Sequence, residues 1–325
     1  MSESLSRKNE IKNFAVEMFK ETPALLIFIL FLVFSILFVP RFSNPQNLFN
    51  ILIQSSELII LACGMTYVFL NGSIDFSVTA ILALSSVVGA MIMTMADNIL
   101  LVFVAIIVMF AIGIGIGAIN GLCVTRLRMP SFITTMSTQL IFAGIALTIT
   151  QSNSIGGIPE SFMSIAHGTL VVIPVPLAIT LCVLTIAIFV LTKTVYGKRL
   201  TAVGTNQQTS FISGIAVRKS VFSIFVISGF LASLASIVMT ARVGAGLPAL
   251  GRDMLMDIVA AVVIGGTSVY GGKANLFGTF IAAIFIVTLN NSLNLMAMDW
   301  FFINACKGFL LLICTFYATV RFVRK

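Results

Sequence analysis

The chain has 325 residues, of which 59% are hydrophobic and 9% charged, and its formal net charge is +8. A soluble domain carries about 25% charged residues, so this composition excludes an ordinary soluble enzyme, and its high hydrophobicity excludes a disordered chain. The apolar residues come in long runs, which excludes a transmembrane β-barrel and predicts an all-α protein, a polytopic bundle of transmembrane helices.

The first 21 residues form a mixed-charge segment ahead of the apolar runs. Ile11, Phe14, Ala15, Met18 and Phe19 fall on one helical face. That spacing predicts an amphipathic helix lying on the cytoplasmic membrane surface over residues 1–21. A frayed, solvated terminus is the alternative. No small-residue cleavage site follows the first apolar run, so we expect that run to be a retained helix rather than a signal peptide.

About ten segments of the chain are candidates for membrane-spanning helices, because a spanning helix needs about 20 mostly apolar residues. They cover residues 23–39, 51–70, 76–95, 99–120, 131–150, 169–191, 221–240, 256–268, 274–290 and 301–317. The eighth segment is short and rich in glycine. No linker or low-complexity stretch interrupts the series, so residues 1–325 are expected to form a single transmembrane domain.

The distribution of Lys and Arg predicts the orientation of these helices. If the N-terminus is cytoplasmic and the helices alternate, fifteen of the nineteen basic residues lie inside. The four outside are Arg41, Arg242, Arg252 and Lys307. Since cytoplasmic loops carry the excess of basic residues, both termini are expected in the cytoplasm. Residues 192–220, a long polar and basic segment, are expected there too, and residues 151–168 form an outside loop.

Glycines in the fourth apolar segment are spaced for close helix packing. Gly113, Gly117 and Gly121 share one helical face, and small residues at that spacing let two helix backbones approach closely in lipid. A nucleotide-binding role is excluded for this run because no strand precedes it. A second glycine-rich run, residues 266–274, lacks the hydroxyl residue that a phosphate-binding loop needs after Lys273. We therefore expect no ATP site in this chain, and a break between two membrane segments at that run.

Polar side chains within the apolar segments are the candidates for a translocation pathway. They are Gln54, Glu57, Asp75, Thr134, Thr138, Asn290 and Asn294. Asn304 and Lys307 add further polar groups to the tenth segment. Polar side chains that form no charge pairs suit a pathway for an uncharged polyhydroxy solute. For any single one of these side chains, a hydrogen bond between helices is the alternative role. Asp75 is also placed to cap a helix that starts at Phe76. Nothing in the sequence resembles a catalytic triad or a metal site.

Several motifs occur in the order found in one transporter family. They include Gly72-Ser-Ile-Asp-Phe-Ser77, Asn120-Gly121, Tyr196-Gly197, Ser213-Gly-Ile215, Gly229-Phe-Leu-Ala-Ser233, Gly265-Gly-Thr-Ser268 and Asn290-Asn-Ser-Leu-Asn-Leu295. The chain resembles the permease subunits of ribose-type ABC sugar importers from about Asn47 to about Leu311. The resemblance implies a protein of the bacterial cytoplasmic membrane that works beside a second permease copy, or a close paralogue, around a shared pathway for a simple sugar.

The resemblance also implies two further partners and one contact segment. A cytoplasmic ATPase subunit would use ATP and magnesium, so this chain would bind no cofactor, and a periplasmic or extracellular sugar-binding protein would deliver the solute. No nucleic acid is expected. Within the cytoplasmic coupling loop, residues 192–220, the family's short coupling helix corresponds to residues 206–214. Its residues are Asn206, Gln207, Gln208, Thr209, Phe211, Ile212 and Gly214. Many relatives carry Glu-Ala-Ala after the asparagine, where this chain has Gln207-Gln-Thr209.

Three other functions are compatible with these features. A permease for nucleosides or branched-chain amino acids would share the same superfamily pattern. A secondary transporter would need groups that bind a coupling ion, and for that role Glu57 and Asp75 are the acids identified. A membrane anchor without transport activity would not need the polar outer halves of the second, ninth and tenth segments.

Overall fold

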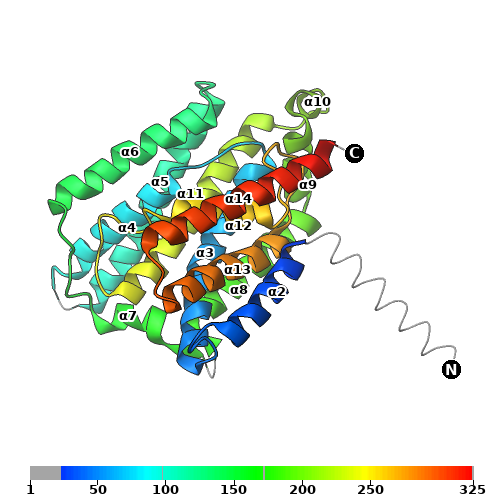
Figure 1. The fold of residues 1–325 in the computed structure, drawn as a ribbon. Coiled ribbons are helices and arrows are strands. Elements are labelled where there is room, and N and C mark those ends of the chain that lie inside the picture. The colour runs from blue at the N-terminus through cyan, green and yellow to red at the C-terminus, as the bar shows by residue number, and fades with distance from the viewer. Residues whose placement is uncertain (1–22, 97, 171–172, 324–325) are drawn as a thin grey trace, which may run out of the picture.

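A computed structural model describes residues 23–96, 98–170 and 173–323 of the chain. These residues form a bundle of helices with one small hairpin, which confirms a helical membrane protein (Figure 1). The helices are α2 (Pro23–Phe38), α3 (Pro45–Leu70), α4 (Val78–Met93), α5 (Ile99–Thr125), α6 (Ser131–Thr150), α7 (Glu160–His167), α8 (Val175–Lys193), α9 (Val195–Thr205), α10 (Gln207–Ile212), α11 (Val217–Val243), α12 (Met254–Ile264), α13 (Leu276–Leu295) and α14 (Trp300–Val323). The amphipathic helix predicted over residues 1–21 lies outside the described residues.

Helices α3 and α11 form the centre of the bundle. From Ser55 to Leu70 every residue of α3 is buried, and this helix packs against α8, α11, α12 and α13. Helix α11 in turn packs against α4 and α5. By contrast, α5, α6 and α8 expose large apolar side chains such as Ile107, Leu140 and Phe189. Such a surface suits a hydrocarbon environment, where exposed apolar groups carry no penalty.

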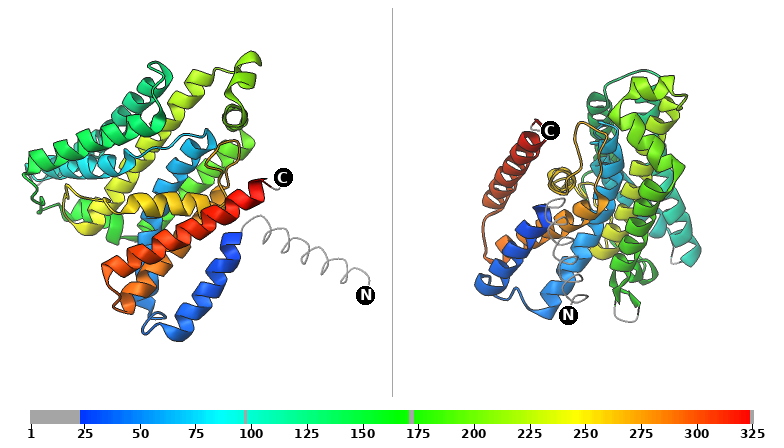
Figure 2. Two further views of the ribbon diagram at one scale, coloured as in Figure 1. Left: turned by 45° about the horizontal axis from the view of Figure 1, so that its top comes forward. Right: turned by 90° about the vertical axis from the view of Figure 1, so that its right-hand side faces the viewer.

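Six of the described helices are long and apolar enough to span a bilayer by length and composition: α3, α5, α6, α8, α11 and α13. Three shorter apolar helices, over residues 28–38, 78–93 and 254–264, correspond to the first, third and eighth predicted spans. The tenth predicted span corresponds to α14, which has 24 residues. Figure 2 shows α14 on the outside of the bundle, and it contacts α12 and α13. Length and composition therefore support a polytopic protein without establishing ten crossings.

The predicted boundary at residue 169 is wrong. Thr169–Leu170 (β1) pairs antiparallel with Ile173–Pro174 (β2), and α8 begins only at Val175. A helix over residues 169–191 would have placed Pro174 and Pro176 in its interior, where proline removes a hydrogen bond and clashes with the preceding turn. The loop predicted to lie outside also contains a helix that the sequence did not predict, α7, which begins directly after Pro159. The first residues of α3 were missed as well, since Asn44 caps this helix by accepting a hydrogen bond from Gln46.

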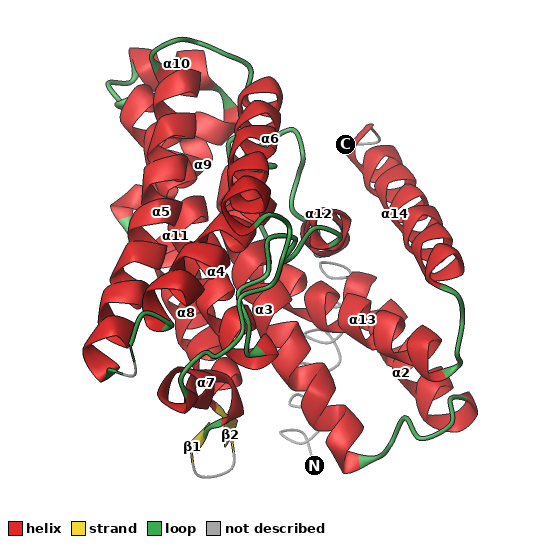
Figure 3. Ribbon diagram, turned by 90° about the vertical axis from the view of Figure 1, so that its left-hand side faces the viewer, coloured by secondary structure: helices red, strands yellow, loops and turns green. Residues whose placement is uncertain are grey.

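The eighth predicted span is short and does not run parallel to its neighbours. Helix α12 has 11 residues; it is seen nearly end-on in Figure 3, whereas α5 and α11 run up the picture. After it the chain continues as a loop, residues 265–275, in which Gly266, Gly271 and Gly272 adopt positive φ angles. These left-handed conformations are accessible to glycine without steric penalty. The break expected at this glycine-rich run is confirmed, and the span predicted to continue to residue 268 ends at Ile264.

Candidate functional site

The glycine face of α5 lies directly against α11. A Cβ atom added at Gly113 would overlap the carbonyl oxygen of Gly229, and one at Gly117 would overlap that of Phe225. At Gly121 it would lie 2.8 Å from the ring of Phe222. At Gly115, on another face, it would meet no atom within 4 Å. The structure thus places three of these glycines where any side chain would separate the two helices.

Asp75 lies in a buried network of hydroxyl and amide groups. One carboxylate oxygen accepts hydrogen bonds from the backbone N–H and the hydroxyl of Ser77, at 3.0 and 2.6 Å, and the other accepts one from Ser228 at 2.7 Å. Asn120 donates to the Ser77 hydroxyl at 2.8 Å and accepts from Thr138 at 2.8 Å. The network joins α5, α6 and α11 to the segment before α4. Helix α4 starts at Val78, and its N-cap residue is Ser77. Asp75 is therefore not the cap of a helix that starts at Phe76; its carboxylate binds Ser77 in the segment before α4.

Glu57 forms a bidentate ion pair with Arg242. The arginine Nε and Nη2 atoms donate to the two carboxylate oxygens at 2.5 and 3.0 Å. Glu57 is 2% exposed, while the Arg242 side chain is 33% exposed, so the arginine lies between the buried carboxylate and the surface. The pair joins α3 to the last turn of α11. Both oxygens of Glu57 are therefore already used within this chain.

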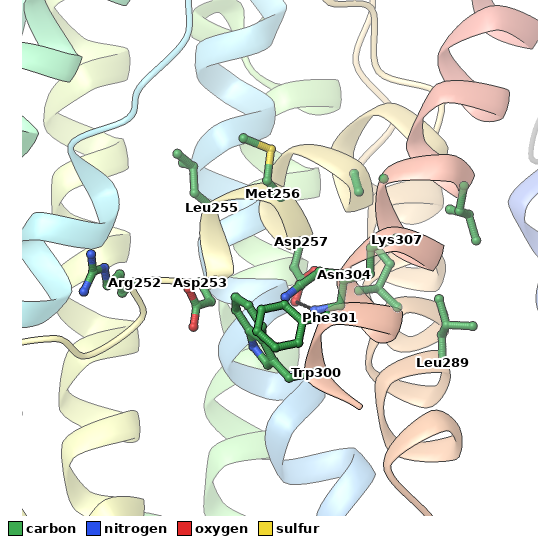
Figure 4. A pocket seen from close by; sticks show the side chains of 14 residues that line it. Arg252, Asp253, Leu255, Met256, Asp257, Leu289, Trp300, Phe301, Asn304 and Lys307 are labelled. Carbon is green, nitrogen blue, oxygen red and sulfur yellow. Dashed lines mark hydrogen bonds and ion pairs between the residues drawn. The ribbon is translucent and has the colours of Figure 1, made fainter. Parts of the chain in front are cut away.

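A second ion pair lies beside a cavity between α12, α13 and α14. Lys307 Nζ donates to Asp257 Oδ2 at 3.0 Å, and Asn290 Nδ2 donates to the same oxygen at 3.2 Å. The cavity has a volume of about 450 Å³. Figure 4 shows the side chains of Asn304 and Lys307 gathered at Asp257, with the rings of Trp300 and Phe301 beside them.

Asp257 was missed at the level of the sequence. It lies in the eighth apolar segment, in the first turn of α12, and an acid within an apolar membrane segment marks a position of interest because burial of its charge is costly. The expectation of polar groups without charge pairs is wrong, since both Glu57 and Asp257 are paired with a base. The pairing depends on helices far apart in the sequence, which spacing along the chain does not reveal.

The seven predicted pathway residues do not form one site in this chain. Thr138 and Asp75 belong to the Ser77–Asn120 network, while Glu57 pairs with Arg242 and Asn290 with Asp257. The other three predicted residues are Gln54, Thr134 and Asn294. Of these, Thr134 is buried and bonded to the carbonyl of Pro130, and the other two are exposed.

The predicted coupling segment is helical and exposed. Helix α10 is capped by Asn206, whose side chain accepts a hydrogen bond from Thr209 N at 2.9 Å, and it ends before Gly214, which has φ +79°. Gln207 and Gln208 are exposed. The side chains of Phe211 and Ile212 are 73% and 78% exposed, so they do not anchor the loop to the body of this chain.

Comparison with known proteins assigns the family. Residues 47–318 match the family described as branched-chain amino acid transport system, permease component. The ribose import permease of Bacillus subtilis is 40% identical over 96% of both chains. The D-allose transport system permease of Escherichia coli is 35% identical over 92% of this chain and 91% of its own. The L-arabinose transport system permease of Escherichia coli is 26% identical over 89% and 87%. No solved structure matches the chain.

The chain therefore belongs to this family of transport permeases. The resemblance to the permease subunits of ribose-type ABC importers is confirmed by the extent of the matches. With its set of long apolar helices, the chain is a multi-pass protein of the bacterial cytoplasmic membrane.

Proposed function

We propose that this chain is the translocation subunit of an ATP-driven importer for a simple sugar. It crosses the membrane ten times with both termini in the cytoplasm, and it works beside a second copy of itself or a close paralogue. A separate ATPase hydrolyses ATP on the cytoplasmic side, and a separate binding protein delivers the sugar from outside. The relatives whose names specify ribose, allose and arabinose support a sugar as the solute.

The observation that carries the proposal is the exposure of Phe211 and Ile212 at α10. Two large apolar side chains on this short helix between α9 and α11 have no partner within the described part of this chain, and water gives them no favourable contact. Four basic residues, Lys198, Arg199, Arg218 and Lys219, are exposed on the flanking helices α9 and α11. An apolar tip surrounded by positive charge fits a partner groove that is apolar at its base and acidic at its rim.

A contact of backbone on backbone links this segment to the membrane helices. A Cβ atom at Gly204, near the end of α9, would overlap the carbonyl oxygen of Leu70 at the end of α3. Gly272 N donates to that same oxygen at 2.9 Å. Because no side chain separates the backbones at Gly204, Leu70 and Gly272, a displacement of α9 and α10 would directly move α3 and the 265–275 loop. This is the route by which a docked ATPase would drive a change between outward-open and inward-open states.

The test is the replacement Phe211→Ala, with Phe189→Ala as the matched control. Phe189 is 59% exposed on α8, away from α10. An apolar anchor in a partner groove often contributes about 2 kcal/mol or more, so Phe211→Ala should weaken binding of the ATPase by roughly thirtyfold and abolish uptake. The control should retain both. Co-purification of the ATPase and sugar uptake in proteoliposomes are the measurements, and thermal unfolding of each variant checks that it is folded.

A permease for branched-chain amino acids is the second candidate, since the family description names that class. The same proteoliposomes distinguish the two. Accumulation of ribose, allose or arabinose supports the sugar assignment, and accumulation of leucine in their place overturns it. Normal co-purification and normal uptake with Phe211→Ala would show that α10 does not couple the two subunits.

A further inference from the structure

The cavity between α12, α13 and α14 is lined by apolar side chains and by equal numbers of acidic and basic residues. Its charged lining residues are Arg252, Asp253, Asp257 and Lys307, two of each sign. A cavity with balanced charges does not favour an ion of either sign. Its volume of about 450 Å³ falls within the range of about 300–1,000 Å³ typical of small-molecule sites.

Several hydrogen-bonding groups of this cavity are still available. Asp257 Oδ2 accepts from Lys307 and Asn290, but Oδ1 accepts no hydrogen bond within the described part of the chain. Over the same residues the side-chain amide of Asn304 has no partner. The Lys307 ammonium has three N–H donors, and one of them is directed at Asp257. A free carboxylate oxygen, a free amide and free ammonium donors together match a ligand whose groups both donate and accept, as hydroxyl groups do.

Two aromatic rings contribute to the apolar lining, together with aliphatic side chains such as those of Leu255, Ile286 and Leu289. Trp300 and Phe301 are in edge contact, with ring centroids 5.2 Å apart and an interplanar angle of 81°, and their side chains remain 57% and 78% exposed. Figure 4 shows both rings next to the Asp257–Asn304–Lys307 group. An aromatic face gives apolar contact to the C–H surface of a sugar ring, while the polar groups beside it bind the hydroxyls. A lipid chain is disfavoured, because it would leave these charged and amide groups without hydrogen bonds.

We propose that this cavity is a transient binding site for an uncharged monosaccharide within the permease. Asp257, Asn304 and Lys307 bind its hydroxyl groups, and Trp300 and Phe301 contact its ring. The proposal rests on the proposed function and adds the position of one sugar site along the pathway. Helix α12 supplies Asp257 and continues into the 265–275 loop, whose Gly272 is bonded to Leu70. A movement of the cytoplasmic segments therefore reaches this site through a single stretch of chain.

The experiment uses the tryptophan of the site as its probe. The chain contains one tryptophan, Trp300, so a change in tryptophan fluorescence reports on this cavity. We expect ribose, allose or arabinose, titrated into the full-length permease in nanodiscs, to change the emission in a saturable manner, and leucine to have no effect. Asn304→Ala should raise the apparent Kd by about two- to tenfold, because it removes one hydrogen bond to the sugar, worth about 0.5–1.5 kcal/mol. The matched control, Asn50→Ala, removes the same side chain from an exposed position of α3, outside the lining of the cavity, and should leave the Kd unchanged.

The Asn304 side chain has no partner in the described part of the chain, so this variant is expected to fold normally, and thermal unfolding verifies this. Absence of any saturable change with all three sugars would overturn the site. Equal effects of the Asn304 and Asn50 variants would overturn it as well. Sugar uptake by the complete importer is measured in parallel: uptake with no fluorescence response refutes the cavity site and leaves the proposed function intact. A fluorescence response to sugars without uptake refutes the function and supports the site.

Discussion

At the scale of single residues, the chain stabilises its buried acids in two ways. Glu57 and Asp257 each face a base from a distant helix, whereas Asp75 is surrounded by hydroxyl and backbone donors. An unpaired carboxylate in an apolar interior is strongly disfavoured. The hydroxyl residues around Asp75 are thus as necessary to the fold as the bases that face the other two acids.

The Glu57–Arg242 pair gives a direct test at this scale. Arg242→Met removes both donors and leaves a carboxylate that is 2% exposed without a partner, and breaking a buried pair in this way costs about 3–5 kcal/mol. We expect a marked fall in the melting temperature of the purified permease. The double variant Glu57→Gln/Arg242→Met removes the uncompensated charge and should recover most of the loss. Arg218→Met, at an exposed position of α11, is the control and should melt like the unmodified protein. A double variant no more stable than Arg242→Met would contradict the charge-pair interpretation.

At the scale of elements, α5 and α11 pack with their backbones in direct contact. This contact depends on glycine from both sides, since a Cβ atom at Gly229 would overlap the carbonyl oxygen of Gly113. In lipid the two helices gain little from apolar burial, so their association depends on van der Waals contact between closely spaced backbones. The interior polar network of Asp75 lies beside this contact, because Asn120 of α5 and Ser228 of α11 both belong to it.

The contact predicts different outcomes for two neighbouring glycines. Gly117→Ala places a methyl group on top of the carbonyl oxygen of Phe225, so the helices must move apart, at a cost of about 1–3 kcal/mol. Gly115→Ala meets no atom within 4 Å and should be neutral or slightly stabilising, because alanine favours a helix over glycine by about 1 kcal/mol. Thermal unfolding and expression level of the two variants are the measurements. Equal values for both would show that the glycine face does not hold these helices together.

At the scale of the whole molecule, α10 lies at one end of the helix bundle, and α7 and the β1–β2 hairpin lie at the opposite end (Figure 3). The asymmetry of basic residues predicts that the α10 end lies in the cytoplasm. In that orientation α10 would face the proposed ATPase, and the loop that contains α7 would face the proposed binding protein. The arrangement assigns opposite sides of the membrane to the two partners of the proposed importer.

Accessibility of cysteines tests this orientation. In a variant whose five cysteines are replaced by alanine, Thr205→Cys, next to α10, should react with a membrane-impermeant maleimide only after the membrane is opened. Ser161→Cys, on α7, should react from outside intact cells. Both positions are exposed, so a lack of reaction reflects the membrane and not burial. Strong labelling of the Thr205→Cys variant from outside intact cells would invert the topology.

The sequence by itself determined the class of protein and most of its helices. Polar side chains are costly in hydrocarbon, so a spanning segment is a run of about 20 apolar residues, and its backbone must be helical to satisfy its own polar groups. Such runs are readable without a fold. For the same reason the helix over residues 131–150 was predicted with its final bounds. The glycine face of α5 was also readable, because its residues lie a few positions apart along one helix. The helical segment beginning at Gln207 was expected from the resemblance to a family and not from local spacing.

The tertiary structure alone decided which polar groups meet. Arg242 faces Glu57 across 185 positions of sequence, and Lys307 faces Asp257 across 50, so neither pair follows from local periodicity. The oblique course of α12, the loop bonded to Leu70 and the cavity beside Trp300 are likewise results of packing. Helix propensity and hydropathy act over a few turns of chain, whereas a site that holds a solute is made where distant segments converge.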